Sequence, residues 1–218
     1  MLVTSSSNKH ALSKRMVTKS EKRRPEIVQA LYKAIEEGGI SLPSYDQVAK
    51  HGDATRQLIR HYFANSEDMA IALCDFLADS YRDCLSRGII MADKSERLKT
   101  FLDFYFDFLA EEGLAKPRDD SVYDALFAYA RSSDRVRKNL RDQYELLQMT
   151  ISHEIQISHQ TLPAEGCREL GFLLVSLMYG HWKMVATLGF SESYNRVSRE
   201  AMDRLIESYL ERYEVPEF

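Results

Sequence analysis

Glycine and proline are scarce in this sequence, at 9 and 5 of its 218 residues. A β-sandwich or β-barrel needs a turn about every 8–12 residues, and such turns depend on these two residue types. The scarcity therefore argues against a many-stranded β fold. Segments with apolar residues at helical spacing instead follow one another along the chain, separated by single breakers. We therefore expect an all-α protein.

Cysteine and long apolar runs are also rare. The three cysteines form no Cys-x-x-Cys pair, and Cys74 and Cys84 lie about 15 Å apart on one expected helix, too far for a disulfide. Residues 1–19 contain no apolar core of signal-peptide length, and the longest apolar run, residues 172–179, is too short to span a bilayer. These absences predict a cytoplasmic protein with reduced thiols and no membrane association.

The charge is unevenly distributed. Residues 1–64 contain 11 Lys and Arg against 6 Asp and Glu, a balance of +5, whereas residues 65–218 contain 18 against 27, a balance of -9. A small basic module joined to a larger acidic one fits a polyanionic partner at one end only, although a segment of +5 also arises by chance.

Helix signals divide the chain into a polar arm and a series of helices. We expect a flexible basic arm over residues 1–20, and then helices near 24–37, 45–51, 56–62 and from 65 or 66 to 87. Further helices are expected near 95–112, 121–131, 134–159 and 164–188, and from 193 or 198 to 213. Ser44 and Gln47 form a Ser-x-x-Gln capping box, and Thr55 is a suitable N-cap.

The short helix that follows Thr55 is the most informative segment. Leu58, Ile59 and Phe63 would face the two preceding helices, which leaves the polar residues on the other side. Such a helix can enter a DNA major groove, where Arg suits guanine and Gln suits adenine. The candidate DNA-binding residues are Ser44, Tyr45, Thr55, Arg56, Gln57, Arg60, His61 and Tyr62. Taken alone, the pattern also fits a solvated helix face.

Residues 27–69 resemble the tetracycline-repressor (TetR) family of bacterial regulators without a gap. The matching segments are Ile27-Val28-Gln29-Ala30-Leu31 with Ile35 and Gly39, Ser44 to Ala49, Gly52-Asp53-Ala54-Thr55, His61-Tyr62-Phe63, and Asn65 to Met69. Asp53 stands where the family's turn usually has glycine, and we expect it to tolerate a left-handed backbone there. The resemblance implies a helix-turn-helix domain over residues 21–66, and an effector-binding and dimerisation domain over residues 67–218.

In the TetR family the larger domain encloses a small-molecule cavity. The resemblance implies that some of the aromatic residues in this region line such a cavity, which would favour a small, largely apolar or aromatic effector. The candidates are Phe104, Phe108, Tyr123, Phe127, Met149, His153, Met178 and Trp182. For any one of them, an ordinary place in the core is the competing interpretation.

The last two helices of the family typically pair across a twofold axis. The residues expected at this interface are Gly171, Gly180, Val197, Ala201, Leu205 and Tyr209. A homodimer would place two recognition helices about 34–36 Å apart, or further by whole turns, and would read a palindromic operator in double-stranded DNA. Binding of an effector would then move the fourth helix and change that separation. The same helices could instead only cover the core of their own chain.

The resulting hypothesis is a dimeric DNA-binding transcriptional regulator, most simply a repressor, with no catalytic activity, no cofactor and no metal. His153, Glu154, His159 and His181 lack the spacing of a metal site, and no nucleophile motif is present. The alternatives are an all-helical small-molecule-binding or adaptor protein that no longer binds DNA, and a helical enzyme.

Overall fold

The computed structural model of the protein describes residues 19–39 and 41–213, without the side chains at 19–22, 84, 85 and 87–91. Within these ranges the chain forms helices and no strand, which confirms the predicted all-α fold. The expected arm lies outside the described residues as far as position 18, and Lys19 and Ser20 already belong to the first helix.

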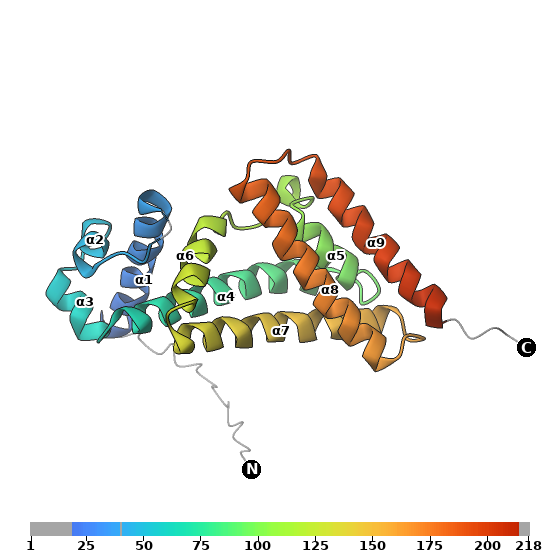
Figure 1. Ribbon diagram of the computed structural model, residues 1–218, viewed down its shortest axis with the longest axis horizontal. Coiled ribbons are helices and arrows are strands. Elements are labelled where there is room, and N and C mark those ends of the chain that lie inside the picture. The colour runs from blue at the N-terminus through green and yellow to red at the C-terminus, as the bar shows by residue number, and fades with distance from the viewer. Residues whose placement is uncertain (1–18, 40, 214–218) are drawn as a thin grey trace, which may run out of the picture.

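The main helices in chain order are α1 (Lys19–Gly38), α2 (Tyr45–Lys50), α3 (Arg56–Tyr62), α4 (Ser66–Met91), α5 (Arg97–Tyr105), α6 (Asp120–Ala130), α7 (Asp134–Ser158), α8 (Ala164–Trp182) and α9 (Tyr194–Tyr213). A short 3-10 helix, η1 (Ala110–Glu112), follows α5, and a π-helical segment, η2 (Lys183–Thr187), continues α8. In Figure 1, α1–α3 form one end of the molecule, α4 and α7 run from it along the long axis, and α8 and α9 form the other end.

Two hydrophobic clusters hold these helices together. The first cluster joins α1–α3 to the N-terminal half of α4, to α6 and to the start of α7, with Ile35, Ile59 and Leu126 among its buried members. The second joins α5, the C-terminal part of α7, α8 and α9, around Phe101 and Leu174. The three N-terminal helices therefore share a core with α4 and α6, and movement of either helix would act directly on them.

Polar contacts fix the N-terminus of α4 to that of α7. Ser133 caps α7 by accepting a hydrogen bond from the Val136 amide, and its hydroxyl donates to Glu67 at 2.6 Å. Arg135, in the first turn of α7, donates to both Glu67 and Asp68. The junction between the N-terminal helices and the larger domain is therefore held by both apolar packing and ion pairs.

The helix expected over residues 95–112 is shorter than predicted. The α5 helix ends at Tyr105, and Asp107 adopts a left-handed backbone conformation with φ of 63°. The Asp107 carboxylate accepts a hydrogen bond from the Lys116 amide at 3.0 Å, which compensates for the unusual conformation. The partner lies nine residues further along the chain, so the helical periodicity of the segment gave no indication of the break.

Candidate DNA interface and effector cavity

The ends of α2 and α3 are capped as the sequence predicts. The Ser44 hydroxyl accepts from the Gln47 amide, and the Ser44 amide donates to the Gln47 side chain, which completes the capping box. Thr55 accepts a hydrogen bond from the Leu58 amide at 3.2 Å and so caps α3. These caps satisfy helix-end amides locally and set the start of each short helix.

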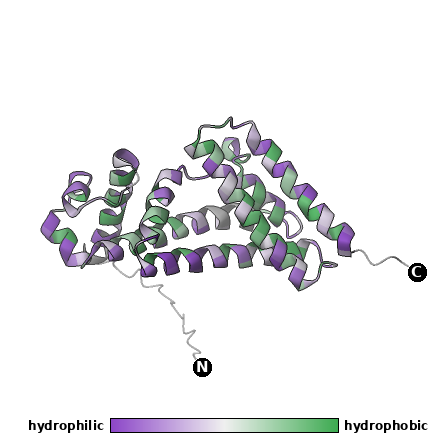
Figure 2. Ribbon diagram, in the orientation of Figure 1, coloured by the Kyte–Doolittle hydropathy of each residue, from purple (hydrophilic) through white to green (hydrophobic). Residues whose placement is uncertain are grey.

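The α3 helix is held by one apolar edge and leaves a polar face exposed. Ile59 and the adjoining Phe63 are fully buried in the first cluster. Arg56, Gln57, Arg60 and His61, which the sequence analysis assigns to DNA, are exposed. Figure 2 shows the end of the molecule that contains α3 as largely hydrophilic on its outer side. The four side chains therefore lie together on an accessible helix surface.

The turn between α2 and α3 depends on close packing against α1. A Cβ atom added at Gly52 would lie 2.8 Å from the Cβ of Ala30, closer than such atoms approach in proteins. Asp53 is not in a left-handed conformation, because Asp107 is the only non-glycine residue of the described ranges with positive φ. The expected left-handed backbone at Asp53 is therefore absent, and the constraint on the turn lies at Gly52.

The remaining candidates lie around α3 with partners of their own. Tyr45, half-buried, donates from its hydroxyl to the Phe63 carbonyl at 3.2 Å, and Tyr62 packs edge-on against His61. Arg56 forms an ion pair with Asp46 of α2 at 2.9 Å, with about half of each side chain exposed. Arg56, which is one of the candidate DNA-binding residues, is thus bound to a carboxylate.

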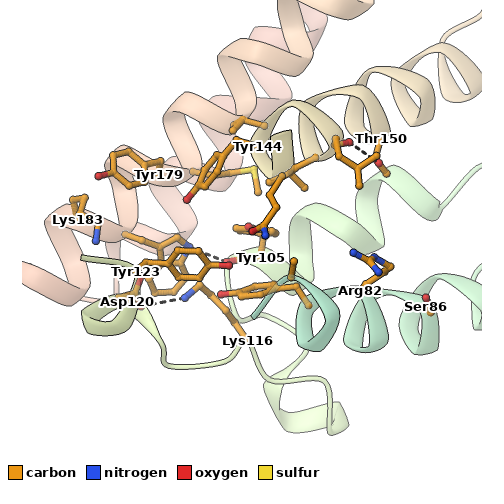
Figure 3. A pocket seen from close by; sticks show the side chains of 18 of the residues that line it. Arg82, Ser86, Tyr105, Lys116, Asp120, Tyr123, Tyr144, Thr150, Tyr179 and Lys183 are labelled. Carbon is orange, nitrogen blue, oxygen red and sulfur yellow. Dashed lines mark hydrogen bonds and ion pairs between the residues drawn. The ribbon is translucent and has the colours of Figure 1, made fainter. Parts of the chain in front are cut away.

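The larger domain contains a cavity of about 460 Å³ between the two hydrophobic clusters. Its wall is built mainly from α4, α5, α6, α7 and α8, and Figure 3 shows tyrosines gathered toward one side, with Arg82, Ser86 and Thr150 toward the other. The lining residues are Ala78, Tyr81, Arg82, Ser86, Arg97, Tyr105, Lys116, Asp120, Tyr123, Gln143, Tyr144, Leu146, Leu147, Thr150, Val175, Met178, Tyr179, Trp182 and Lys183.

Three of the eight predicted pocket residues line this cavity, namely Tyr123, Met178 and Trp182. Phe127 lies directly behind the wall, where its ring contacts Tyr144 and Tyr179. The other four do not line the cavity: Phe104 is buried, whereas Phe108, Met149 and His153 are exposed.

Several cavity residues are not among the predicted ones, including Tyr81, Arg97, Tyr105 and Lys116. Tyr105 lies between the candidates Phe104 and Phe108 in the sequence, so its aromatic character was a usable signal. The others come from separate elements and share no sequence pattern.

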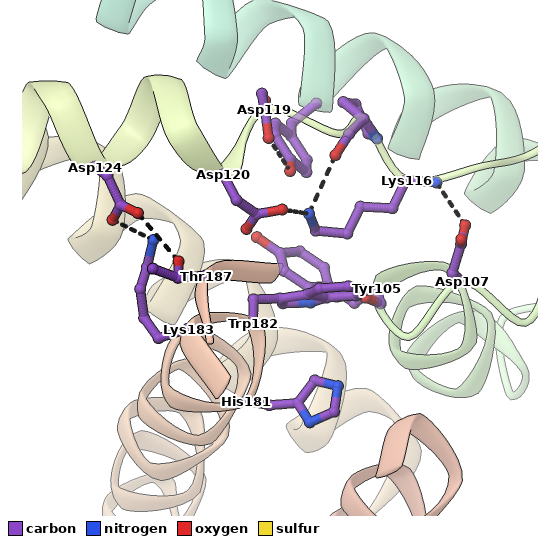
Figure 4. A network of polar contacts seen from close by, with 12 residues as sticks. Tyr105, Asp107, Lys116, Asp119, Asp120, Asp124, His181, Trp182, Lys183 and Thr187 are labelled. Atoms are coloured by element: carbon purple, nitrogen blue, oxygen red, sulfur yellow. Dashed lines mark hydrogen bonds and ion pairs between the residues drawn. The ribbon is translucent and has the colours of Figure 1, made fainter. Parts of the chain in front are cut away.

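Charged side chains at the aromatic side of the cavity are bound to neighbours, as Figure 4 shows. The ammonium group of Lys116 donates to Asp120 and to the Pro117 carbonyl, both at 3.1 Å, and lies 4.1 Å from the centre of the Trp182 ring. Lys183 of η2 forms an ion pair with Asp124 of α6. These contacts connect α6 to the end of α8 across the cavity wall.

The predicted dimer residues fall into two groups. Gly171 is buried within the chain, where an added Cβ would lie 2.2 Å from the Ser152 hydroxyl oxygen of α7. Its lack of a side chain therefore allows the close contact between α7 and α8. Gly180 and Val197 are exposed, and a Cβ at Gly180 would meet nothing within 4 Å. Ala201, Leu205 and Tyr209 are half-buried on α9.

The histidines that were considered as metal ligands are not grouped with other possible ligands in the described part of the chain. His181 is buried, with its ring nitrogens at hydrogen-bond distance from Asn195 and Ser198, and burial lowers its pKa. The part of the chain that the structure describes contains no group of His, Cys, Asp and Glu able to hold a metal ion. None of the described helices is both long and apolar enough to cross a membrane.

Comparison with known proteins gives relatives of one kind, although no protein-family model matches the chain. The HTH-type transcriptional regulator BetI of Escherichia coli O17:K52:H18 (strain UMN026 / ExPEC) is 25% identical over 170 residues, which cover 77% of this chain and 84% of the relative. A TetR-family transcriptional regulator from Cytophaga hutchinsonii has a TM-score of 0.72 at 18% identity, over 88% of this chain and 96% of that chain. A proposed transcriptional regulator from Saccharomonospora viridis, solved in complex with choline, has a TM-score of 0.66 at 19% identity, over 85% and 96% of the two chains.

The chain therefore has the fold of the TetR-family transcriptional regulators, with an N-terminal helix-turn-helix and a larger helical domain. The resemblance to this family that the sequence predicts is confirmed. The similarity to BetI, an HTH-type transcriptional regulator, extends over most of both chains. These relatives are regulators and not enzymes.

Proposed function

We propose that the protein is a cytoplasmic, homodimeric repressor that binds a palindromic operator in double-stranded DNA and responds to a small-molecule effector. The observation that carries the proposal is the exposed polar face of α3, held from behind by the buried Ile59 and Phe63. In this proposal Arg56, Gln57 and Arg60 contact base edges, because guanidinium and amide groups pair with the major-groove edges of guanine and adenine.

Other residues around α3 would contact phosphates and fix its orientation on the duplex. The hydroxyls of Ser44, Thr55 and Tyr62 and the exposed His61 suit this role, and Tyr45 supports it from behind α3 through the Phe63 carbonyl. In this division of the chain, residues 21–66 bind DNA and residues 67–218 bind the effector and the second subunit.

Filter binding of genomic DNA fragments to the full chain over a salt series tests DNA recognition. We expect a small set of fragments to be retained, with affinity that falls steeply as salt rises, because bound Lys and Arg release counterions. Arg56→Ala should cost about 1–3 kcal/mol at one operator position and relax the base preference there. The exposed Arg118, remote in sequence from α3, provides the matched control, Arg118→Ala.

Retention of no fragment at low salt would favour the alternative, an all-helical small-molecule-binding or adaptor protein that has lost DNA binding. The Asp46–Arg56 ion pair is the observation that favours this alternative, since it places a carboxylate on the proposed DNA-binding face.

Exposed apolar side chains on α8 and its continuation support the homodimer. Phe172, Met184 and Leu188 are 59%, 44% and 65% exposed, and on α9 Val197 is 53% exposed. Apolar side chains gathered on adjoining elements mark a surface that another molecule covers. Because α8 and α9 pack side by side, two copies could form a four-helix interface related by a twofold axis.

Analytical ultracentrifugation tests this interface. Phe172→Glu should shift the chain from dimer to monomer, because a charge would be buried against its symmetry copy. Glu165→Gln, a change at an exposed position of the same helix, serves as a control for altered charge. A wild-type chain that sediments as a monomer at micromolar concentration would contradict the dimer.

The effector would act through helices that the cavity shares with the DNA-binding end. The α4 helix begins next to α3 and supplies Tyr81 to the cavity, while α6 packs against α1 and supplies Asp120 and Tyr123. An effector that binds one arrangement of α4 and α6 more tightly than another would shift the separation of the two α3 helices. The choline complex of the Saccharomonospora viridis protein supports a small-molecule effector.

A further inference from the structure

The cavity wall has an excess of positive charge. Arg82, Arg97, Lys116 and Lys183 line it, against the single carboxylate of Asp120. Three of these cations have carboxylate partners: Lys116 with Asp120, Lys183 with Asp124, and Arg82 with Asp79. Arg97 differs from them, because the described residues place no carboxylate within ion-pair distance of its guanidinium group.

Arg97 is also incompletely hydrogen-bonded. Its Nε atom is buried and has no hydrogen-bond partner in the described part of the chain. A buried donor without a partner costs free energy, and a charged one costs more, so such a group in a native structure requires an explanation. Its place on the wall of a cavity supplies one, since a bound molecule can provide the missing acceptor.

The cavity is elongated, with different chemistry at its two ends. Arg97 and Tyr105 are the first and last residues of α5, eight positions apart, which corresponds to about 12 Å along a helix. Since α5 follows α4 after a short turn and packs against it, Arg97 lies near the C-terminal half of α4, from which Arg82 and Ser86 reach the cavity. Leu147, Val175 and Met178 add apolar wall.

The aromatic end offers hydroxyl donors. Tyr105, Tyr123 and Tyr144 line it, and none of their hydroxyls has a hydrogen-bond partner among the described residues. Burial raises the pKa of each of these phenols above its ordinary value, so they stay protonated at neutral pH. They can therefore donate to oxygen atoms of a ligand.

The position in the cavity best suited to a cationic ligand, over the face of Trp182, is already occupied by a side chain of the protein. Aromatic faces attract ammonium groups, and Trp182 is the best such face in the cavity wall. The Lys116 ammonium group lies over this ring, bound to Asp120 and to the Pro117 carbonyl. A second cation would have to displace a lysine that holds three partners.

We propose that the effector of this protein is an elongated organic anion, with its carboxylate bound by Arg97 and its apolar body extending toward the tyrosine end. This inference rests on the proposed function, of which it specifies the ligand class. The guanidinium group suits a carboxylate because its donors match the two oxygens of that group.

A matched series of probes with the same apolar chain tests the charge preference. Octanoate, octanol and octyltrimethylammonium are titrated into the full chain, and binding is followed by the shift in melting temperature and by calorimetry. We expect octanoate to bind most tightly, octanol more weakly, and octyltrimethylammonium to give no shift. Tighter binding of octyltrimethylammonium than of octanoate, or no binding of octanoate, would overturn the proposal.

Variants at Arg97 test the anchor. Arg97→Gln should weaken octanoate binding by about tenfold or more, while Arg97→Lys should retain part of it, because a charged hydrogen bond is worth more than a neutral one. Arg118→Gln, at an exposed position outside the cavity wall, should bind octanoate as the wild type does. Equal octanoate affinity in Arg97→Gln and the wild type would overturn the assignment of Arg97.

The test of the ligand class can fail independently of the test of DNA binding. Because Arg97 lies in the larger domain, Arg97→Gln should retain the same genomic fragments. Because the substitution removes a buried donor that has no partner, the variant without ligand should melt no lower than the wild type. If genomic fragments are retained but octanoate does not bind, only the proposed ligand class is wrong. If octanoate binds but no fragment is retained, the ligand class stands and the regulator proposal fails.

Discussion

The ion pair between Asp46 and Arg56 predicts a gain of operator affinity on Asp46→Asn. In the free protein the two side chains meet at 2.9 Å and are about half exposed. An exposed ion pair of this kind stabilises the free protein by about 0.2–1 kcal/mol, and it must break before Arg56 can bind guanine. Removing the carboxylate removes that cost, so affinity for the operator should rise by up to about fivefold.

A double-mutant cycle with Arg56→Ala separates this effect from general repulsion. Fluorescence anisotropy with a labelled operator measures the four affinities. In the Arg56→Ala background, Asp46→Asn should retain only the part of the gain that comes from reduced repulsion of phosphates, which salt screens. Asp53→Asn, a change at an exposed residue of the neighbouring turn that forms no ion pair within the described ranges, controls for that repulsion. An equal gain in both backgrounds, or a loss in the wild-type background, would show that the ion pair does not compete with operator binding.

Three further predictions concern stability, measured by chemical denaturation. Gly52→Val should destabilise the fold by about 1–3 kcal/mol, because a side chain at this position meets Ala30, and an unchanged midpoint would contradict the close contact. Gly171→Ala should likewise destabilise, whereas Gly180→Ala should be neutral or stabilise by up to about 1 kcal/mol; the reverse order would be incompatible with the packing of α8. Burial raises the pKa of Asp119 to about 6, so its contribution to stability is full at acidic pH and is lost as pH rises through about 6. The stability of Asp119→Asn relative to the wild type should therefore rise by up to about 3 kcal/mol from pH 4 to pH 7, and a constant difference would show that this carboxyl does not titrate as inferred.

The sequence predicted the helix-turn-helix closely because its determinants are local. Ser44 with Gln47 and Thr55 cap helices within three residues, and the observed α3 has the predicted bounds of residues 56–62. The positive φ at Gly39 likewise ends α1 where glycine predicts a C-terminus. Short-range hydrogen bonds and backbone preferences of this kind can be inferred from neighbouring residues alone.

The cavity was predicted poorly because it is assembled from elements far apart in the chain. Tyr81 comes from a helix and Lys116 from a loop, and no periodicity in the sequence indicates that the two lie close together. The role of Lys116 in the cavity wall follows from its contact with Trp182, which the sequence does not indicate. Gly171 illustrates the same limit: small size indicates that something approaches closely, but not whether the neighbour is α7 or a second chain. Only the packed structure distinguishes these cases.

The most direct test of base recognition by α3 is selection of operator sequences from random DNA by the wild type and by Gln57→Ala. We expect a palindromic consensus for the wild type. In the variant we expect loss of preference at one symmetry-related pair of positions, with the remaining positions unchanged. Identical consensus sequences for the two proteins would contradict the assignment of Gln57, and the absence of any consensus for the wild type would contradict base recognition by α3.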